Sequence, residues 1–113
     1  MTDQDTNDVG RLVAAVDLGS NSFHVTVAKL TASGLQIVMR DRERVRLASG
    51  LDDTDQLDEA SITRGVEALQ RFDARLSAVD PADIRVVGTH TLREAVNVEV
   101  FIDRASAVFR API

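Results

Sequence analysis

The sequence predicts a mixed α/β fold with a single sheet. Three strand-like runs come first, then a long helix with one apolar face, a short fourth strand and a second helix. This order, β-β-β-α-β-α, is typical of a mixed sheet with helices packed on it. With 113 residues the chain can form one modest hydrophobic core. Because the order stops after a helix, we expect an N-terminal fragment, truncated before its next strand.

The first two strands enclose a small polar turn. Residues 12–17 are almost continuously apolar, which is the pattern of a strand covered on both faces. Residues 23–30 form a second apolar run, and residues 19–22, Gly-Ser-Asn-Ser, lie between the two. The chain therefore reverses at a turn that is too polar for the core.

The third predicted strand changes character along its length. A hairpin turn at 31–34 leads into residues 35–47, which begin apolar and then become charged. Arginines alternate there and therefore share one face, with two acidic residues on the other face. That face is either a track for a polyanion or simply a solvated surface, and the pattern leaves both open. The arginines are Arg40, Arg42, Arg44 and Arg46, and the acids are Asp41 and Glu43.

The second half of the chain reads as helix, strand, helix. The spacing of apolar residues predicts a helix over 58–78, with Asp58 as its N-cap and Asp80-Pro81 as its stop. Residues 84–88 form a short strand, followed by a polar turn at 89–93 and a helical turn at 92–96. We expect Asn97 to cap a last helix that runs to Phe109.

Composition and charge restrict the expected location and partners of the protein. Residues 1–10 are polar and acidic and predict a disordered leader that is neither a signal nor a transit peptide. No apolar run approaches the length of a membrane span, and the chain has no cysteine. The net charge of -5 argues against general nucleic-acid binding. We therefore expect a cytoplasmic protein with no nucleic-acid partner and no membrane span.

The polar turn is the leading candidate site. Gly19, Ser20, Asn21 and Ser22 can bring backbone N–H groups and hydroxyls against a phosphate, and Asp17 could orient Mg²⁺ or its waters. The alternatives are an ordinary hairpin turn and an aspartate that caps it. We favour the phosphate-binding interpretation.

A second group of candidates follows the fourth strand. Arg93 is predicted at the start of a helical turn, where its planar guanidinium could bind two phosphate oxygens. Thr89 and Thr91 could donate hydroxyls to the same ligand, or could merely cap the helix. Arg93 could also be a solvated surface residue. His24 and His90 have no companion ligands at metal spacing, so we interpret both as structural.

Three segments resemble one family. Residues 14–24 (AAVDLGSNSFH), 44–51 (RVRLASGL) and 87–97 (VGTHTLREAVN) are similar to motifs of the exopolyphosphatase/guanosine pentaphosphate phosphohydrolase family, in the same order. The resemblance implies a ribonuclease H-like half-domain of the actin/Hsp70/sugar kinase superfamily, with 11–113 as the N-terminal part of the first phosphatase domain. It also implies Mg²⁺-dependent hydrolysis that releases terminal orthophosphate from polyphosphate or converts guanosine pentaphosphate to tetraphosphate.

The resemblance assigns the candidate residues to roles. Gly19, Ser20, Asn21, Ser22 and Arg93 would bind substrate phosphate, and Asp17 would hold the metal. Arg44, Arg46, Thr89 and Thr91 are candidate polyanion contacts. In that family the general base is a glutamate in a Glu-Glu-Ala-Arg segment, which would follow Ile113, and a second glycine-rich loop closes on the phosphate. We therefore assign no catalytic residue to this chain.

The remaining expectations concern a chain without the Glu-Glu-Ala-Arg segment and the second glycine-rich loop. Residues 1–113 alone should be inactive and prone to self-association, and a homodimer is a candidate assembly of the full-length protein. Two other functions stay open. One is a non-catalytic nucleotide- or alarmone-binding module, or an inactive truncated fragment. The other is a kinase of the same superfamily, which would use Asp17 and the turn for ATP. Such kinases lack the Thr-His-Thr-Leu-Arg segment that this chain contains at 89–93, so this alternative is less favoured.

Overall fold

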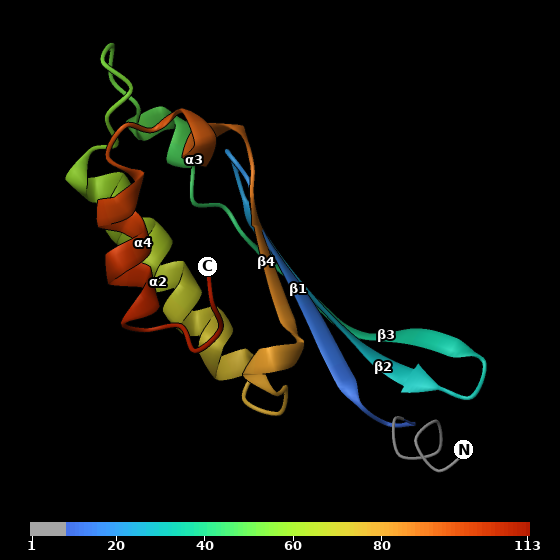
Figure 1. The fold of residues 1–113 in the computed structure, drawn as a ribbon. Coiled ribbons are helices and arrows are strands. Elements are labelled where there is room, and N and C mark those ends of the chain that lie inside the picture. Colours follow the sequence, from blue (N-terminus) through green and yellow to red (C-terminus); the bar gives the residue numbers. More distant parts are fainter. Residues whose placement is uncertain (1–8) are drawn as a thin grey trace.

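The chain folds into one mixed sheet with its helices packed on one face (Figure 1). The computed structural model describes residues 9–113, and within them the strand order is β3-β2-β1-β4. β1 pairs antiparallel with β2 and parallel with β4, and β2 pairs antiparallel with β3. The predicted order β-β-β-α-β-α is confirmed. The elements are β1 (Leu12–Leu18), β2 (Phe23–Thr31), β3 (Gly34–Glu43), η1 (Leu47–Gly50), α2 (Glu59–Arg75), η2 (Pro81–Asp83), β4 (Ile84–Gly88), α3 (His90–Glu94) and α4 (Val98–Ser106).

The core lies between the sheet and the pair α2 and α4. Alternate residues of β1 and β2 turn toward the helices, and Phe23 packs edge-on against Phe101 of α4, with ring centroids 6.3 Å apart. Gly65 of α2 lies beside these rings. A Cβ there would come within 2.7 Å of the Phe101 ring, so a glycine allows the close approach. This packing fixes α2 against the sheet near the β1–β2 turn.

The opposite face of the sheet is uncovered by the described residues. We predicted that residues 12–17 are covered on both faces, and for this chain that prediction is wrong. Because α2 and α4 lie on the same side of the sheet (Figure 1), the described residues leave its other face open. Ala15 on that face is exposed and helps to line a mostly apolar hollow of about 390 Å³. β4 also has no partner on its outer edge within residues 9–113, and Val87 is 56% exposed. β4 is therefore an edge strand of the sheet among the described residues.

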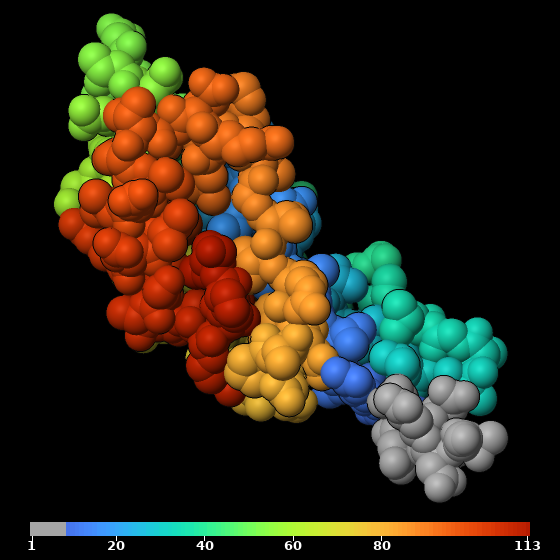
Figure 2. Space-filling model, in the orientation of Figure 1, coloured from blue at the N-terminus to red at the C-terminus, as the bar shows by residue number. Residues whose placement is uncertain are grey.

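Several predicted boundaries need correction. The third strand ends at Glu43 rather than at 47. The chain leaves the sheet there because Arg46 adopts a left-handed backbone (φ 55°) as the N-cap of η1, which begins at Leu47. Beyond the helices, the β2–β3 hairpin projects as an arm (Figure 2), which explains its exposed apolar side chains. The Asp58 cap is confirmed, since its carboxylate accepts from the Ser61 amide at 2.7 Å, but α2 ends at Arg75 rather than at 78.

Asn97 flanks the last helix without capping it. Its side chain instead pairs with Leu57, accepting from the Leu57 amide at 2.9 Å and donating to the Leu57 carbonyl at 3.0 Å. This pairing ties the loop before α2 to the start of α4. The helix ends at Ser106 rather than at Phe109.

The predicted leader covers residues 1–10, of which 1–8 lie outside the described residues. The Gly10 amide donates to the Leu30 carbonyl at 2.7 Å, so the last predicted leader residue is already joined to the sheet. Among residues 9–113, no helix combines the length and the apolar character that crossing a membrane requires.

Candidate phosphate-binding site

The candidate site lies where β1 and β4 end together. These strands are parallel and pair Leu18 with Gly88, so their carboxyl ends meet at one edge of the sheet. The β1–β2 turn and the start of α3 both leave from that edge (Figure 1). In open α/β sheets, ligands bind in the crevice outside the carboxyl ends of the strands.

The turn at 19–22 is tight and held from outside. The Gly19 amide donates to the Ser22 carbonyl at 3.1 Å, and a Cβ on Gly19 would lie 2.6 Å from that oxygen. The amides of Arg46 and Ala48 donate to the carbonyls of Asn21 and Ser20, at 2.8 and 2.9 Å. Residue 19 must therefore be a glycine. The hydrogen bonds from Arg46, just before η1, and from Ala48, within η1, fix the shape of the turn.

Three backbone amides of the turn have no acceptor among the described residues. Within residues 9–113, the amides of Ser20, Asn21 and Ser22 donate to no acceptor. Successive backbone N–H groups of this kind form a concave donor set that suits an anion. These three amides are thus available as donors to an anion such as phosphate.

Asp17, the residue before the last of β1, carries an oxygen without a partner within residues 9–113. Its Oδ1 is buried and has no hydrogen-bond partner among the described residues. A buried, unsatisfied carboxylate oxygen is costly unless a ligand completes it. The described residues hold no cluster of three or more His, Cys, Asp or Glu around a metal position. The predicted metal role of Asp17 rests on this one unpartnered oxygen, and a single carboxylate is a ligand that hydrated Mg²⁺ accepts when water and phosphate oxygens complete its shell.

Thr91 connects the turn to α3. It is only 2% exposed, and its hydroxyl donates to Ser20 Oγ at 2.7 Å. Because Ser20 Oγ accepts this bond, the Ser20 proton remains available for another acceptor. Thr89 sits at the N-cap position of α3 without capping it, and instead donates its hydroxyl to the Leu18 carbonyl at 3.1 Å. Both threonines therefore support the turn rather than serve as helix caps.

Arg93 lies differently from the prediction. It belongs to the last turn of α3 rather than the start, and its amide donates to the Thr89 carbonyl at 3.2 Å, so no free N–H accompanies it. Its guanidinium is exposed and makes no ion pair or hydrogen bond with the described residues. The structure thus brings Thr91 and Asp17 to the turn but does not place Arg93 in contact with it. His90 is exposed at the first residue of α3.

A polar pocket of about 420 Å³ opens beside the turn. Asn21 and Ser22 line it together with Arg42, Arg44 and Arg46. The alternation that predicted a shared arginine face is confirmed for these three, although strand β3 ends before the last two. Our narrower set of polyanion contacts omitted Arg42, because only Arg44 and Arg46 fall in the family-like segment.

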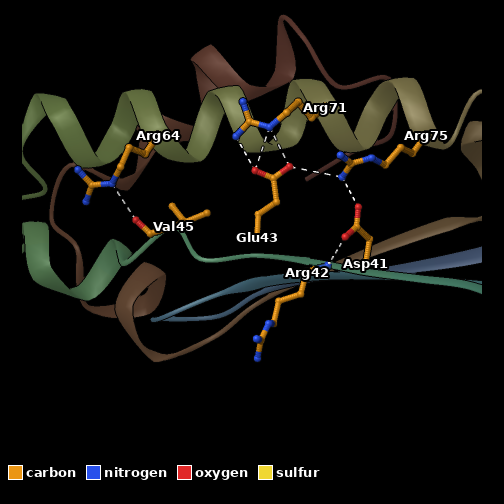
Figure 3. A network of polar contacts seen from close by, with 7 residues as sticks. All are labelled: Asp41, Arg42, Glu43, Val45, Arg64, Arg71 and Arg75. Carbon is orange, nitrogen blue, oxygen red and sulfur yellow. Dashed lines mark hydrogen bonds and ion pairs between the residues drawn. The ribbon is translucent and has the colours of Figure 1, made fainter.

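The acidic residues of β3 are engaged on the other side by α2. Arg71 makes a forked contact with Glu43, with its Nε 2.8 Å from Oε2, and Arg75 pairs with Asp41 (Figure 3). The Arg71 hydrogen bonds hold the pKa of the Glu43 carboxyl below its ordinary value, and Glu43 raises the pKa of Arg71. Figure 3 shows Arg42 directed away from α2. The strand thus has its anions paired on one face and its cations on the other.

Arg64 is a contributor that the sequence analysis missed. Its Nε donates to the Val45 carbonyl at 2.9 Å (Figure 3). Its Nη2 donates to the Arg46 carbonyl at 3.3 Å and to the buried Ser61 hydroxyl at 2.9 Å. These contacts hold the segment that carries Arg44 and Arg46. A charged residue on a helix gives no sequence signal for backbone carbonyl partners so far away in the chain.

Known proteins of similar sequence cover most of the chain. A putative exopolyphosphatase of Haemophilus influenzae is 46% identical over 91% of the chain, and a guanosine-5'-triphosphate,3'-diphosphate pyrophosphatase of Pseudoalteromonas atlantica is 45% identical over 90%. The chain spans only 32% and 20% of these two proteins.

Solved structures agree with the fold. The Aquifex aeolicus member of the Ppx/GppA family superposes with a TM-score of 0.79 at 25% identity, over 86% of this chain and 32% of that protein. An exopolyphosphatase from Cytophaga hutchinsonii superposes with a TM-score of 0.84 at 22% identity, over 90% of this chain and 33% of that protein, and supports the fold alone. The predicted ribonuclease H-like, actin-type half-domain is therefore confirmed.

The family model of the Ppx/GppA phosphatases matches residues 26–113. That match begins after the turn, so the polar turn and Asp17 lie outside it, while β4, α3 and the arginine segment lie within it. The chain belongs to the Ppx/GppA phosphatase family.

Proposed function

We propose that the intact protein hydrolyses a terminal phosphoanhydride, releasing orthophosphate from inorganic polyphosphate or from guanosine pentaphosphate. The names of the relatives cover both substrates, and the sequence does not choose between them. The observation that carries the proposal is the site at the end of β1, where an unsatisfied Asp17 oxygen lies beside a rigid turn with free amides.

The residues of this chain would grip and position the terminal phosphoryl group. The amides of the 19–22 turn and the Ser20 proton would bind its oxygens, and Asp17 would hold Mg²⁺ or its waters. Mg²⁺ would offset the negative charge that spreads over the phosphoryl oxygens in the transition state. The resemblance places the carboxylate that orients water beyond Ile113, so this chain's own part is positioning and electrostatics.

Arg93 remains part of the proposal as a mobile donor. Its side chain is exposed and unpaired among residues 9–113, so it can turn toward a phosphate bound at the neighbouring edge. A guanidinium fork binds two phosphate oxygens at once, whereas lysine offers a point charge. Arg93→Lys should therefore lose activity although the charge is kept.

The test is the release of orthophosphate by the intact protein, in Mg²⁺, from long-chain polyphosphate and from guanosine pentaphosphate. We expect turnover with at least one substrate and a loss of about tenfold or more for both Arg93→Lys and Arg93→Ala. The matched control is Arg85→Lys, because Arg85 is exposed and lies near the start of β4, at the end of the strand away from the turn. Binding of either compound without phosphate release would favour the non-catalytic binding module instead, and full activity of both Arg93 variants would remove Arg93 from the site.

A further inference from the structure

The pocket next to the turn contains cationic side chains that the binding of a single phosphate at the turn does not require. Arg42, Arg44 and Arg46 line it together, and Asn21 and Ser22 of the turn form the rest of its lining. The pocket is therefore continuous with the candidate phosphate site, since two residues belong to both.

The three guanidinium groups have no counter-ion among the described residues. None of them makes an ion pair or side-chain hydrogen bond with a residue in the range 9–113, and all three are exposed. The nearest acidic residues on the strand, Asp41 and Glu43, are paired with Arg75 and Arg71 of α2 on the other face. In a chain of net charge -5, this sorting leaves a concentrated positive pocket.

The backbone under these arginines is fixed. The Arg46 amide donates to the Asn21 carbonyl, and the carbonyls of Val45 and Arg46 accept from Arg64. Arg46 is held with φ at 55°, a backbone conformation that L side chains rarely adopt. A non-glycine residue in this conformation, fixed by bonds at its amide and its carbonyl, points to a side chain whose position matters.

We propose that this pocket is a second anion subsite, which binds the phosphate groups that follow the terminal one in a linear phosphoanhydride chain. Arg42, Arg44 and Arg46 are its anion-binding residues, and Arg64 is a positioning residue that acts through the backbone at 45 and 46. The inference rests on the proposed function for the direction of the chain, with the terminal phosphate at the 19–22 turn and the rest in the pocket. Inorganic polyphosphate and a nucleoside pentaphosphate share this chemistry.

The test compares two double variants of the intact protein. In Arg44→Gln/Arg46→Gln two pocket cations are removed, whereas Arg85→Gln/Arg104→Gln removes two exposed arginines that neither line the pocket nor belong to the alternating arginine segment. Affinity for tripolyphosphate is measured by calorimetry without Mg²⁺, and the KM for long-chain polyphosphate and for guanosine pentaphosphate is measured with Mg²⁺. Each charged contact contributes enough that its loss weakens binding about tenfold.

We expect the pocket variant to bind tripolyphosphate at least about tenfold more weakly, with a flatter salt dependence, while the control variant binds normally. The KM should rise for the substrate that uses the pocket, with kcat nearly unchanged. A rise for polyphosphate alone assigns the subsite to inorganic chains, and a rise for the pentaphosphate alone assigns it to nucleotides.

Equal tripolyphosphate affinity of the pocket variant and the unaltered protein would overturn the subsite. This affinity measurement does not depend on whether the protein hydrolyses either substrate. Tripolyphosphate binding that is lost in the pocket variant, in a protein that hydrolyses neither substrate, would uphold the subsite and refute the proposed hydrolysis. Arg64→Lys should weaken binding less than the double variant does, and Arg64→Met more than Arg64→Lys, because lysine can still donate to one carbonyl.

Discussion

The hydrogen bond between Thr91 and Ser20 offers a sharp test of how the turn is prepared for a ligand. Thr91 is 2% exposed and donates to Ser20 Oγ at 2.7 Å. Thr91→Val keeps the side-chain shape but removes the donor. Loss of a buried hydrogen bond should lower the free energy of unfolding by about 1–2 kcal/mol.

The same substitution should act on binding through the Ser20 proton. In the native structure Ser20 Oγ accepts from Thr91, which directs the Ser20 proton toward another acceptor. Without that bond, the Ser20 hydroxyl can rotate, and its contact with a phosphate oxygen weakens. A hydrogen bond to a charged group contributes about 1.5–3 kcal/mol, so kcat/KM should fall by roughly tenfold or more.

A double-mutant cycle separates the two effects. If Thr91 acts through Ser20, then Ser20→Ala and Ser20→Ala/Thr91→Val should have similar kcat/KM in the intact protein. Thr63→Val, on the exposed face of α2, controls for the exchange of threonine for valine. Independent, additive losses in kcat/KM would refute the coupling between the two hydroxyls.

Two further predictions concern the turn and its support. Gly19→Ala should abolish most orthophosphate release and lower the free energy of unfolding by about 1–3 kcal/mol, because its Cβ would lie 2.6 Å from the Ser22 carbonyl oxygen; normal activity would show that the turn tolerates a shift. Glu43→Gln should be less stable than the native protein near pH 7, and this difference should shrink as the pH falls below about 4.5. The reason is that Arg71 holds the pKa of Glu43 below its ordinary 4.5, so the stabilisation is present above that value and is lost as the carboxylate is protonated. Urea titrations of both proteins across this range measure it, and a difference that does not change with pH would contradict it.

The order of elements and the position of the turn could be predicted from the sequence because they depend on local patterns. Alternating or continuous apolar runs define the strands, and the Asp58 carboxylate caps a helix through its immediate neighbours. The error at the end of β3 has a non-local cause. Arg46 leaves the strand because its amide bonds to Asn21, and Arg64 holds the adjacent carbonyls from another element.

The sequence indicates where a candidate site lies, but not the contacts that support it. An acidic residue at a strand end before a glycine-containing polar turn has few structural uses, so Asp17 and the turn could be found from the chain alone. Asn97 shows the limit of such patterns: it has the residue type and position of an N-cap, but its amide pairs with Leu57, forty residues earlier in the sequence. Likewise, the role of Thr91 depends on β1 and β4 lying side by side, which no local pattern reports.

The central claim, that Asp17 and the adjacent turn hold a phosphate together with Mg²⁺, is tested most directly by Asp17→Asn in the intact protein. The amide is nearly isosteric, and Asp17 Oδ1 has no partner within residues 9–113 to lose, so the free energy of unfolding without metal should stay the same or rise slightly. The shift in melting temperature that Mg²⁺ and phosphate produce together should disappear, and orthophosphate release should fall at least about 100-fold. An unchanged melting-temperature shift and near-normal release at the same Mg²⁺ concentrations would contradict the claim.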